Sequence, residues 1–296
     1  MNKESQKSFT LLELLVVIAI IAILAGVVIA SVVDLRQRAK ESKGMQFSQN
    51  IRTTLSNDLV GEWNFDEGIG VVAKDTSDEG NEGRLFNLST QCTNPPTSPC
   101  PTWTDGKIKG ALQFYGNNGY VDCGDSNELD LSKEITIEAW IYPTPPTLTY
   151  YRAIVAKYSQ SDNKRAYQLI VDEGYSKYLG QGTIQFWISS NGSTLRDHVE
   201  APGELNKWQH VVGVYNGSKM TIYVNGELKD EKNTTISSIF VTDRPLRIGS
   251  DQVLSRFFLG KIDEVRIYGS ALTAKQIKNL YAESLPRHLT SKNETR

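Results

Sequence analysis

The sequence predicts an α+β fold that is mainly β, in which one long N-terminal helix precedes a β-sandwich. Three observations support this fold class. Residues 9–33 are almost wholly apolar, and residues 34–58 repeat apolar side chains at helical spacing. From residue 61 onward, apolar and polar residues alternate in short runs separated by turn residues. A chain of 296 residues has room for one large domain or two ordinary ones.

The apolar segment carries a single charge, Glu13, and is otherwise free of ionisable side chains. Roughly twenty apolar residues in a helix span ~30 Å, the thickness of the hydrocarbon core of a bilayer. We therefore expect a transmembrane helix here. The lysines that precede it favour a cytoplasmic N-terminus, so the remainder of the chain lies outside the inner membrane.

The following segment is polar but periodic. It contains no proline, and Phe47, Ile51 and Leu55 recur at intervals of four, which places them in one stripe on a helix. We expect residues 9–59 to form one continuous transmembrane and stalk helix.

The N-terminal stretch KSFTLLE at 7–13 resembles the processing signal of type IV prepilins and pseudopilins. In that family a short basic leader is cut before a Phe, the freed amine is methylated, and a Glu occupies the fifth mature position. The resemblance implies that a prepilin peptidase removes the leader, residues 1–8, by cutting between Ser8 and Phe9. The family usually has Gly where this chain has Ser8.

The same resemblance implies that Glu13 pairs with the Phe9 amine of a neighbouring pilin subunit in a homo- or hetero-polymer. Removing one partner of a buried ion pair costs about 3–5 kcal/mol, so the pair would fix the register of assembly. The protein is then expected in the bacterial inner membrane before assembly. Afterwards it would lie in a pilus or pseudopilus, at the cell surface or in the periplasm. Alternatively, Glu13 only complements the dipole of the helix N-terminus.

Residues 60–283 are expected to form the head and residues 284–296 a flexible tail. Within 135–141 four aliphatic residues alternate with polar or aromatic ones, and Asn-Gly pairs at 216–217 and 225–226 predict hairpins. A short helix is expected from Thr273, its N-cap, to about Glu283. Four tryptophans in predicted strands are expected in the core: Trp63, Trp140, Trp187 and Trp208.

Seven segments of the head, taken in order, resemble a laminin-G-like jelly roll of the concanavalin A-like superfamily. They include GEWNFDEG at 61–68, ITIEAWIYP at 135–143, WQHVVGVYNG at 208–217 and GKIDEVRIYGSALTAKQI at 260–277. The resemblance implies two antiparallel sheets packed face to face. Since no room remains for another pilin head before residue 61, we expect this jelly roll to be the head itself.

Proteins similar to this head often hold one Ca²⁺ near a sheet edge. Calcium takes six to eight oxygen ligands, and the loop 74–83 is rich in them. The candidate calcium ligands are Asp66, Glu67, Asp75, Asp78, Asn81 and Asp263. The alternative is a solvated acidic loop, with Asp263 bonded to backbone amides. The three histidines show no zinc-binding spacing.

An enzyme is not expected. Glucanases of the superfamily carry an E-x-D-x-x-E pattern that this chain lacks. In a strand, Glu134 and Glu138 would lie ~13 Å apart, beyond the roughly 5–9.5 Å between the carboxyl groups of glycosidases.

Loop tyrosines are the candidate ligand-binding residues, because exposed aromatic rings suit stacking on sugars or contacts with proteins. They are Tyr150, Tyr151, Tyr175 and Tyr178, and ordinary loop packing is the alternative for each. The net charge of −2 gives no indication of nucleic-acid binding.

The cysteines fit an exported protein. Cys92 and Cys100 flank a short proline-stiffened loop and are expected to form a disulfide. Cys123 is expected to be a buried free thiol.

The sequence therefore predicts a type IV pilin-like subunit that displays a laminin-G-like head able to bind a glycan or a surface protein. The alternative is a membrane-anchored carbohydrate- or protein-binding protein that never polymerises. A third hypothesis is a carbohydrate-active enzyme with a lost or unusual site.

Overall fold

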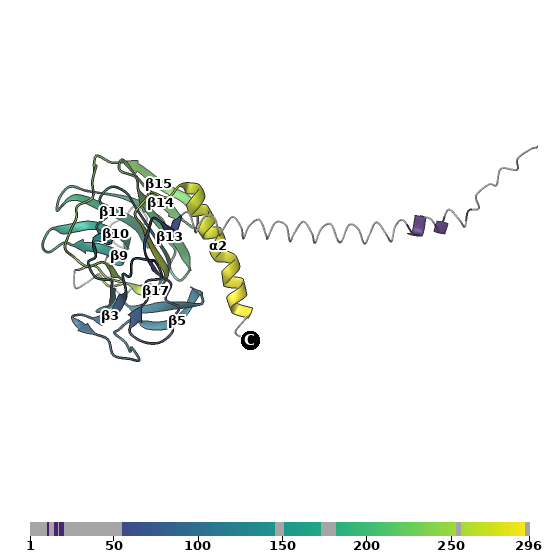
Figure 1. The fold of residues 1–296 in the computed structure, drawn as a ribbon, viewed down its shortest axis with the longest axis horizontal. Coiled ribbons are helices and arrows are strands. Elements are labelled where there is room, and N and C mark those ends of the chain that lie inside the picture. The colour runs from purple at the N-terminus through teal and green to yellow at the C-terminus, as the bar shows by residue number, and fades with distance from the viewer. Residues whose placement is uncertain are drawn as a thin grey trace, which may run out of the picture. The chain divides into compact units, whose positions relative to one another are not determined.

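The computed structural model describes residues 55–145, 151–172, 182–252 and 256–293, and nearer the N-terminus residues 11, 15, 16 and 18–20 (Figure 1). For residues 286–293 it describes the backbone alone. The chain divides into two compact units, residues 1–53 and 54–296.

In the N-terminal unit, the described residues are helical and their side chains are exposed. Among the described residues, no helix combines the length and apolarity that a membrane span requires. Most of the predicted span at 9–33 lies outside the described residues, as do Ser8, Phe9 and Glu13. The transmembrane helix, the cleavage site and the assembly contact therefore stay predictions.

The second unit, the head, is built from two antiparallel sheets. The first sheet runs in the order β15 (Glu227–Asn233), β14 (Lys219–Val224), β13 (Gln209–Tyr215), β8 (Ile135–Pro143), β17 (Leu259–Tyr268), β6 (Gly110–Tyr115) and β5 (Thr102–Ile108), and β1 (Leu59–Trp63) also pairs with β17. The second sheet runs in the order β12 (Arg196–Ala201), β11 (Thr183–Gly192), β10 (Lys164–Asp172), β9 (Arg152–Ser159), β16 (Arg247–Ile248), β7 (Gly119–Asp122), β3 (Gly83–Asn87) and β2 (Val72–Ala73), and β4 (Thr90–Gln91) pairs with β3. A 3₁₀ turn, η1 (Asn127–Leu129), follows β7. The predicted β-sandwich is thereby confirmed.

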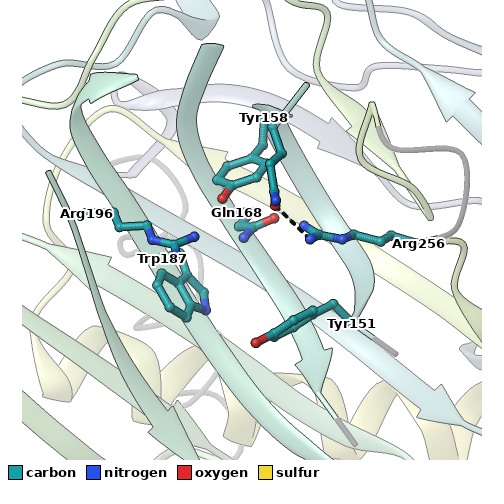
Figure 2. Close-up of a pocket in the computed structure, with 7 residues that line it drawn as sticks. Tyr151, Tyr158, Gln168, Trp187, Arg196 and Arg256 are labelled. Carbon is teal, nitrogen blue, oxygen red and sulfur yellow. Dashed lines mark hydrogen bonds between the residues drawn. The ribbon is translucent and has the colours of Figure 1, made fainter. Parts of the chain in front are cut away.

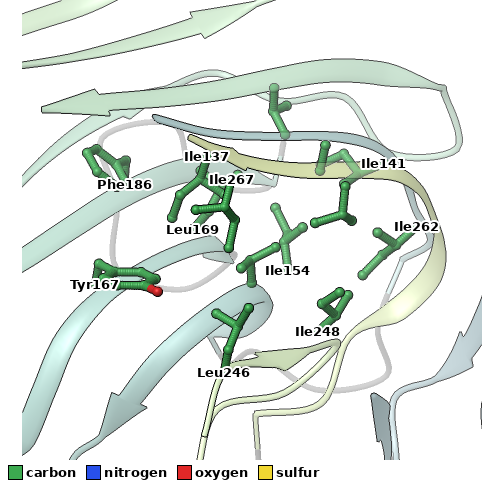
Figure 3. Close-up of a cluster of buried hydrophobic side chains, with 14 of the residues drawn as sticks. Ile137, Ile141, Ile154, Tyr167, Leu169, Phe186, Leu246, Ile248, Ile262 and Ile267 are labelled. Carbon is green, nitrogen blue, oxygen red and sulfur yellow. The ribbon is translucent and has the colours of Figure 1, made fainter. Parts of the chain in front are cut away.

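The core lies between the two sheets (Figure 3). The first sheet contributes Ile137 and Ile267, and the second contributes Leu169 and Phe186, all at 0 % exposure. Burial of each such side chain contributes roughly 1.5–3 kcal/mol. The predicted alternation in β8 is confirmed, because its four aliphatic residues within 135–141 all belong to this core.

Both predicted Asn-Gly turns are confirmed. Gly217 has a φ of +87° between β13 and β14, and the side chain of Asn216 accepts a hydrogen bond from the amide of Lys219 at 2.8 Å. Between β14 and β15, Asn225 and Gly226 have φ values of +53° and +76°. Two successive positive φ values match the twist of the flanking strands.

The C-terminal helix α2 (Ala274–Asn293) begins where the sequence predicts. The amide of Gln276 donates to Thr273 Oγ1, and the amide of Thr273 donates to Gln276 Oε1 at 2.8 Å, which forms a capping box. The predicted end near Glu283 is wrong, since α2 continues to Asn293. Residues 284–293 are therefore helical rather than a loose tail: polar composition alone does not end a helix.

The tryptophans divide between different environments. Trp63 is fully buried in the core, as predicted. Trp140 is buried too, but on the outer face of the first sheet, where its ring stacks on Tyr281 of α2 with centroids 5.9 Å apart. The prediction is wrong for Trp187 and Trp208, which are half-buried. Trp208 precedes β13 and packs edge-on against Tyr142.

A disulfide joins Cys92 and Cys100, the pairing that their spacing predicts. Cys123 is a buried free thiol, and burial raises the pKa of this thiol well above its usual value. It is therefore unreactive at neutral pH.

Candidate ligand-binding site

One row of side chains crosses the outer face of the second sheet. Strand pairing places four residues directly beside one another, in the order Ala156, Gln168, Trp187 and His198. The residues that alternate with them, such as Leu169 and Phe186, point into the core. Because successive side chains of a strand point to opposite faces, the row must face away from the core.

A pocket of about 160 Å³ opens on this row (Figure 2). Its lining residues come from β9, β10, β11, β12 and the segments that flank β9 and β17: Tyr151, Tyr158, Gln160, Gln168, Trp187, Arg196 and Arg256. Beneath them lies a small apolar cluster, separate from the core, that includes Ala153, Ala156 and Ile170. Because the side chains of Ala153 and Ala156 are small, they leave room for the pocket between the rings of Tyr151, Tyr158 and Trp187.

Trp187 is held in a fixed orientation. Its indole Nε1 donates a hydrogen bond to Gln185 Oε1 at 2.8 Å. The amide nitrogen of Gln185 donates in turn to carboxylate oxygens of Asp172 and Glu200, at 3.3 and 3.2 Å. His198 stacks on the indole in parallel, with ring centroids 4.0 Å apart. The ring therefore presents a preorganised apolar surface to the pocket.

Two guanidinium groups border the pocket, each over an aromatic ring (Figure 2). Arg196 Cζ lies 5.2 Å from the ring centroid of Trp187, and Arg256 Cζ lies 5.1 Å from that of Tyr151. Arg256 also donates to Asp251 at 3.1 Å and to Gln160 at 2.8 Å. Arg196 has no carboxylate partner among the described residues.

Gln168 lies at the base of the pocket between these groups. The residue is only 3 % exposed, yet its side-chain Oε1 is buried without a hydrogen-bond partner in the described part of the chain. A buried acceptor that lacks a donor costs about 1–3 kcal/mol. A ligand that donated a hydrogen bond at this point would offset that cost.

Tyr151 is the predicted ligand-binding residue that the structure brings to this pocket. Tyr150, Tyr175 and Tyr178 lie outside the described residues. Sequence reasoning missed Gln168, Trp187 and Arg196. The signal for Trp187 was the strand alternation itself, because Phe186 and Ile188 on either side of it are both core residues.

The predicted calcium ligands fall into two groups. Asp75 and Asn81 hold the loop 74–83 against β1 through hydrogen bonds. The carboxylate of Asp75 accepts from the amides of Glu62 and Asn81, at 2.8 and 2.7 Å, and Asn81 bonds to the carbonyl of Val60. Asp78 is exposed.

The second group lies beside the turn that joins β5 to β6. Asp66 accepts from the amide of Gly110 at 3.0 Å, and Asp263 Oδ2 accepts from the amides of Lys107 and Ile108. Asp263 Oδ1 is buried without a partner, as is Glu67 Oε2, and burial raises the pKa of Asp263 well above its usual value. In the described residues, no three His, Cys, Asp or Glu side chains form a metal-binding cluster. Glu67 Oε1 accepts from the amide of Lys74 at 2.7 Å, at the start of the loop 74–83.

A network of charged side chains lies on the outer face of the first sheet. His210 Nε2 lies 2.9 Å from Glu138 Oε1, and Arg266 contacts Glu138, Glu264 and Glu62. Burial acts to raise the pKa of Glu138, but Arg266 and His210 outweigh it and hold this pKa below its usual value. Glu138 is 1 % exposed and His210 0 %, whereas the side chains of Arg266 and Glu62 retain 11 % and 20 % exposure.

Comparison with known proteins agrees with this architecture. The family model of the concanavalin A-like lectin/glucanases superfamily matches residues 115–278, more than half of the chain, and the prokaryotic N-terminal methylation motif matches residues 4–29. A fimbrial protein of Moraxella nonliquefaciens is 31 % identical over 121 residues, which cover 40 % of this chain and 71 % of that protein.

Solved structures resemble the head in fold. Domain 4 of AbnA, an extracellular arabinanase from Geobacillus stearothermophilus solved with arabinotriose, aligns with a TM-score of 0.56 at 19 % identity, over 76 % of this chain and 98 % of that one. The ligand-binding domain of botulinum neurotoxin serotype D, solved with N-acetylneuraminic acid, aligns with a TM-score of 0.57 at 13 % identity, over 79 % of this chain and 52 % of that one. The chain therefore belongs to the fimbrial proteins that carry the prokaryotic N-terminal methylation motif of type IV pilins, and its head belongs to the concanavalin A-like lectin/glucanase superfamily.

Proposed function

We propose that the chain is a type IV pilin-like subunit that assembles through its N-terminal helix and displays a lectin-like head, whose pocket on the second sheet binds a sugar residue of a surface glycan. Prepilin peptidase would cut between Ser8 and Phe9 in the inner membrane. The methylation motif and the fimbrial relative support the assembly part of this proposal.

The observation that carries the binding part is the pocket on the outer sheet face. It combines the fixed ring of Trp187, the ring of Tyr151 and the unpartnered buried carbonyl of Gln168. Sugars present C–H faces that pack on aromatic rings and hydroxyl groups that donate hydrogen bonds. That the similar AbnA domain was solved with arabinotriose supports a sugar as ligand.

Binding is tested on the isolated head, residues 54–296. This unit has its own core, because every residue of the core cluster lies between Trp63 and Ile267. On a glycan array, the wild-type head should bind a defined set of glycans, and Trp187→Ala should lose them. Trp208→Ala is the matched control, since Trp208 is also half-buried but adjoins the first sheet. Binding by Trp187→Ala at the wild-type level would refute the site.

Assembly is tested on filaments sheared from cells. Mass spectrometry of this subunit should find an N-terminus at methylated Phe9. A subunit that begins at Met1, or filaments that lack it, would favour a membrane-anchored binding protein instead.

Calcium is a further part of the proposal, restricted to Asp263 and Asp66, which both accept backbone amides of residues 107–110. The oxygens of Asp75 already accept backbone amides, whereas Asp263 Oδ1 has no partner among the described residues. A bound cation would satisfy this oxygen and hold the turn between β5 and β6.

A further inference from the structure

Two features of the pocket on the second sheet indicate the class of its ligand: the charge of Arg196 and the unpartnered acceptor Oε1 of Gln168. We propose that this pocket takes an acidic sugar residue, in which one ring carries a carboxylate that Arg196 binds and a hydroxyl group that donates to Gln168. The inference rests on the proposed lectin function.

The first step is size. A volume of about 160 Å³ is well below the roughly 300–1,000 Å³ of pockets that enclose drug-sized molecules. The pocket therefore suits one sugar ring rather than an oligosaccharide buried along its length. The remaining rings of a glycan would extend into solvent.

The second step is charge. Arg256 already donates to Asp251 and Gln160, so both terminal nitrogens of its guanidinium group have partners within the protein. Arg196 is exposed and makes no ion pair in the described residues, yet its guanidinium is held over the indole of Trp187. A planar guanidinium whose orientation is set by a ring can bind a carboxylate through two parallel hydrogen bonds. The pocket thus offers one available cation in a defined position.

The third step is the acceptor. The buried Oε1 of Gln168 needs a donor, and a simple anion such as sulfate or acetate has none to give at neutral pH. A neutral sugar would satisfy Gln168 but leave Arg196 unused. Only a molecule with both an anionic group and hydroxyl donors meets both residues, and uronic and sialic acids are sugars of this kind.

The experiment compares glycans in pairs that differ by the carboxylate: galacturonate and galactose oligomers, glucuronate- and glucose-terminated oligomers, and sialyllactose and its carboxyl-reduced form. Calorimetry on the head, residues 54–296, should show at least one acidic member binding about ten-fold more tightly than its neutral partner, as a charge-assisted hydrogen bond predicts. Arg196→Gln should reduce the acidic member to the affinity of the neutral one.

The matched control is Arg84→Gln, since Arg84 is an exposed arginine of β3, far along the strand order of the same sheet. It should leave the preference unchanged. Gln168→Leu should weaken acidic and neutral members alike, because its partner is a hydroxyl group that both carry. An unaltered preference in Arg196→Gln would overturn the proposal.

Equal wild-type affinity for acidic and neutral members, lost in Trp187→Ala, would refute the acidic specificity and leave the lectin function standing. No binding of any sugar by a folded wild-type head would refute both.

Discussion

The indole of Trp187 and the imidazole of His198 lie parallel, with ring centroids 4.0 Å apart and planes 10° from each other. The two residues are direct cross-strand partners on β11 and β12. Burial is the main cause that lowers the pKa of His198; Lys232 and Arg196 add to it, while Glu200 and Asp197 act against it. At neutral pH the stack is therefore one between an indole and a neutral imidazole.

This lowered pKa predicts a pH dependence of stability. In the unfolded chain His198 binds a proton at its usual pKa, near 6.5, whereas in the fold it resists protonation until lower pH. Between these values the unfolded state holds more protons, so stability should fall as the pH drops below about 6.5. His198→Gln should flatten this part of the curve, measured by urea unfolding of the head from pH 7.5 to pH 5. Parallel curves for variant and wild type would contradict the assignment.

Docking of α2 is predicted to limit the residue at position 226. Gly226 has a φ of +76°, and a Cβ there would lie 3.0 Å from Tyr281 Cδ1. Gly124 has a φ of +74° with nothing within 4 Å of such a Cβ. Gly124→Ala should therefore cost about 1 kcal/mol of left-handed backbone strain, and Gly226→Ala measurably more.

A double-mutant cycle isolates this contact. In a Tyr281→Ala background, the extra cost of Gly226→Ala should vanish, because the ring that the new Cβ meets is gone. Guanidinium unfolding of the four proteins gives the coupling energy. A coupling energy of zero would mean that α2 does not pack on this turn.

Local pattern predicted much of the fold. The period-two run in β8, the two Asn-Gly turns and the cap at Thr273 depend on short-range stereochemistry that a single sequence displays. The sequence does not predict the end of α2 at Asn293, because the length of a helix depends on its tertiary contacts and on the helix propensity of its exposed residues.

The site was harder to predict than the fold. Tyr151 was found because it is an aromatic residue in a loop. Gln168 and Arg196 become partners of one pocket only through the register of β10, β11 and β12, which composition does not specify. The apolar size of Trp187 favours the core, and only its alternation with Phe186 and Ile188 places it on the outer face of the sheet.

Glu138→Gln tests the buried network on the first sheet. Arg266 and His210 lose the charge of a partner that is 1 % exposed, so the head should lose roughly 3 kcal/mol of stability at pH 7. Glu128→Gln, on the exposed turn η1, is the control and should change stability by less than about 0.5 kcal/mol.

The same variant carries a pH signature. Because the pKa of Glu138 is held below its usual value, its contribution is complete above the unfolded pKa, near 4.5, and is lost as the pH falls through the folded pKa. Wild type and Glu138→Gln should therefore converge in stability on acidification below pH 4.5. A difference that stays constant to pH 3 would show that charge is not the cause.

Calcium at Asp263 predicts a chelator effect. If the cation binds the folded head, Ca²⁺ at a concentration of 100 times Kd should raise the free energy of unfolding by about 2.7 kcal/mol. The melting temperature in excess Ca²⁺ should therefore be higher than that in EDTA. Asp263→Asn should abolish the difference, whereas Asp78→Asn, on the exposed loop, should retain it. Equal melting temperatures of the wild type in Ca²⁺ and EDTA would dispose of the cation.

Glu13→Ala separates a polymer subunit from a membrane tether. A pilin-like subunit needs the carboxylate to neutralise the Phe9 amine of its neighbour, and one unpaired charge in an apolar filament core costs about 3–5 kcal/mol. The variant should therefore remain in the inner membrane at wild-type level and be depleted from sheared filaments by at least ten-fold, measured by immunoblot of both fractions. Glu4→Ala, in the predicted leader, is the control and should assemble normally, because the proposed cut between Ser8 and Phe9 would remove it before assembly. If filaments incorporate Glu13→Ala at the wild-type level, Glu13 has no role in assembly and the apolar segment acts only as a membrane anchor.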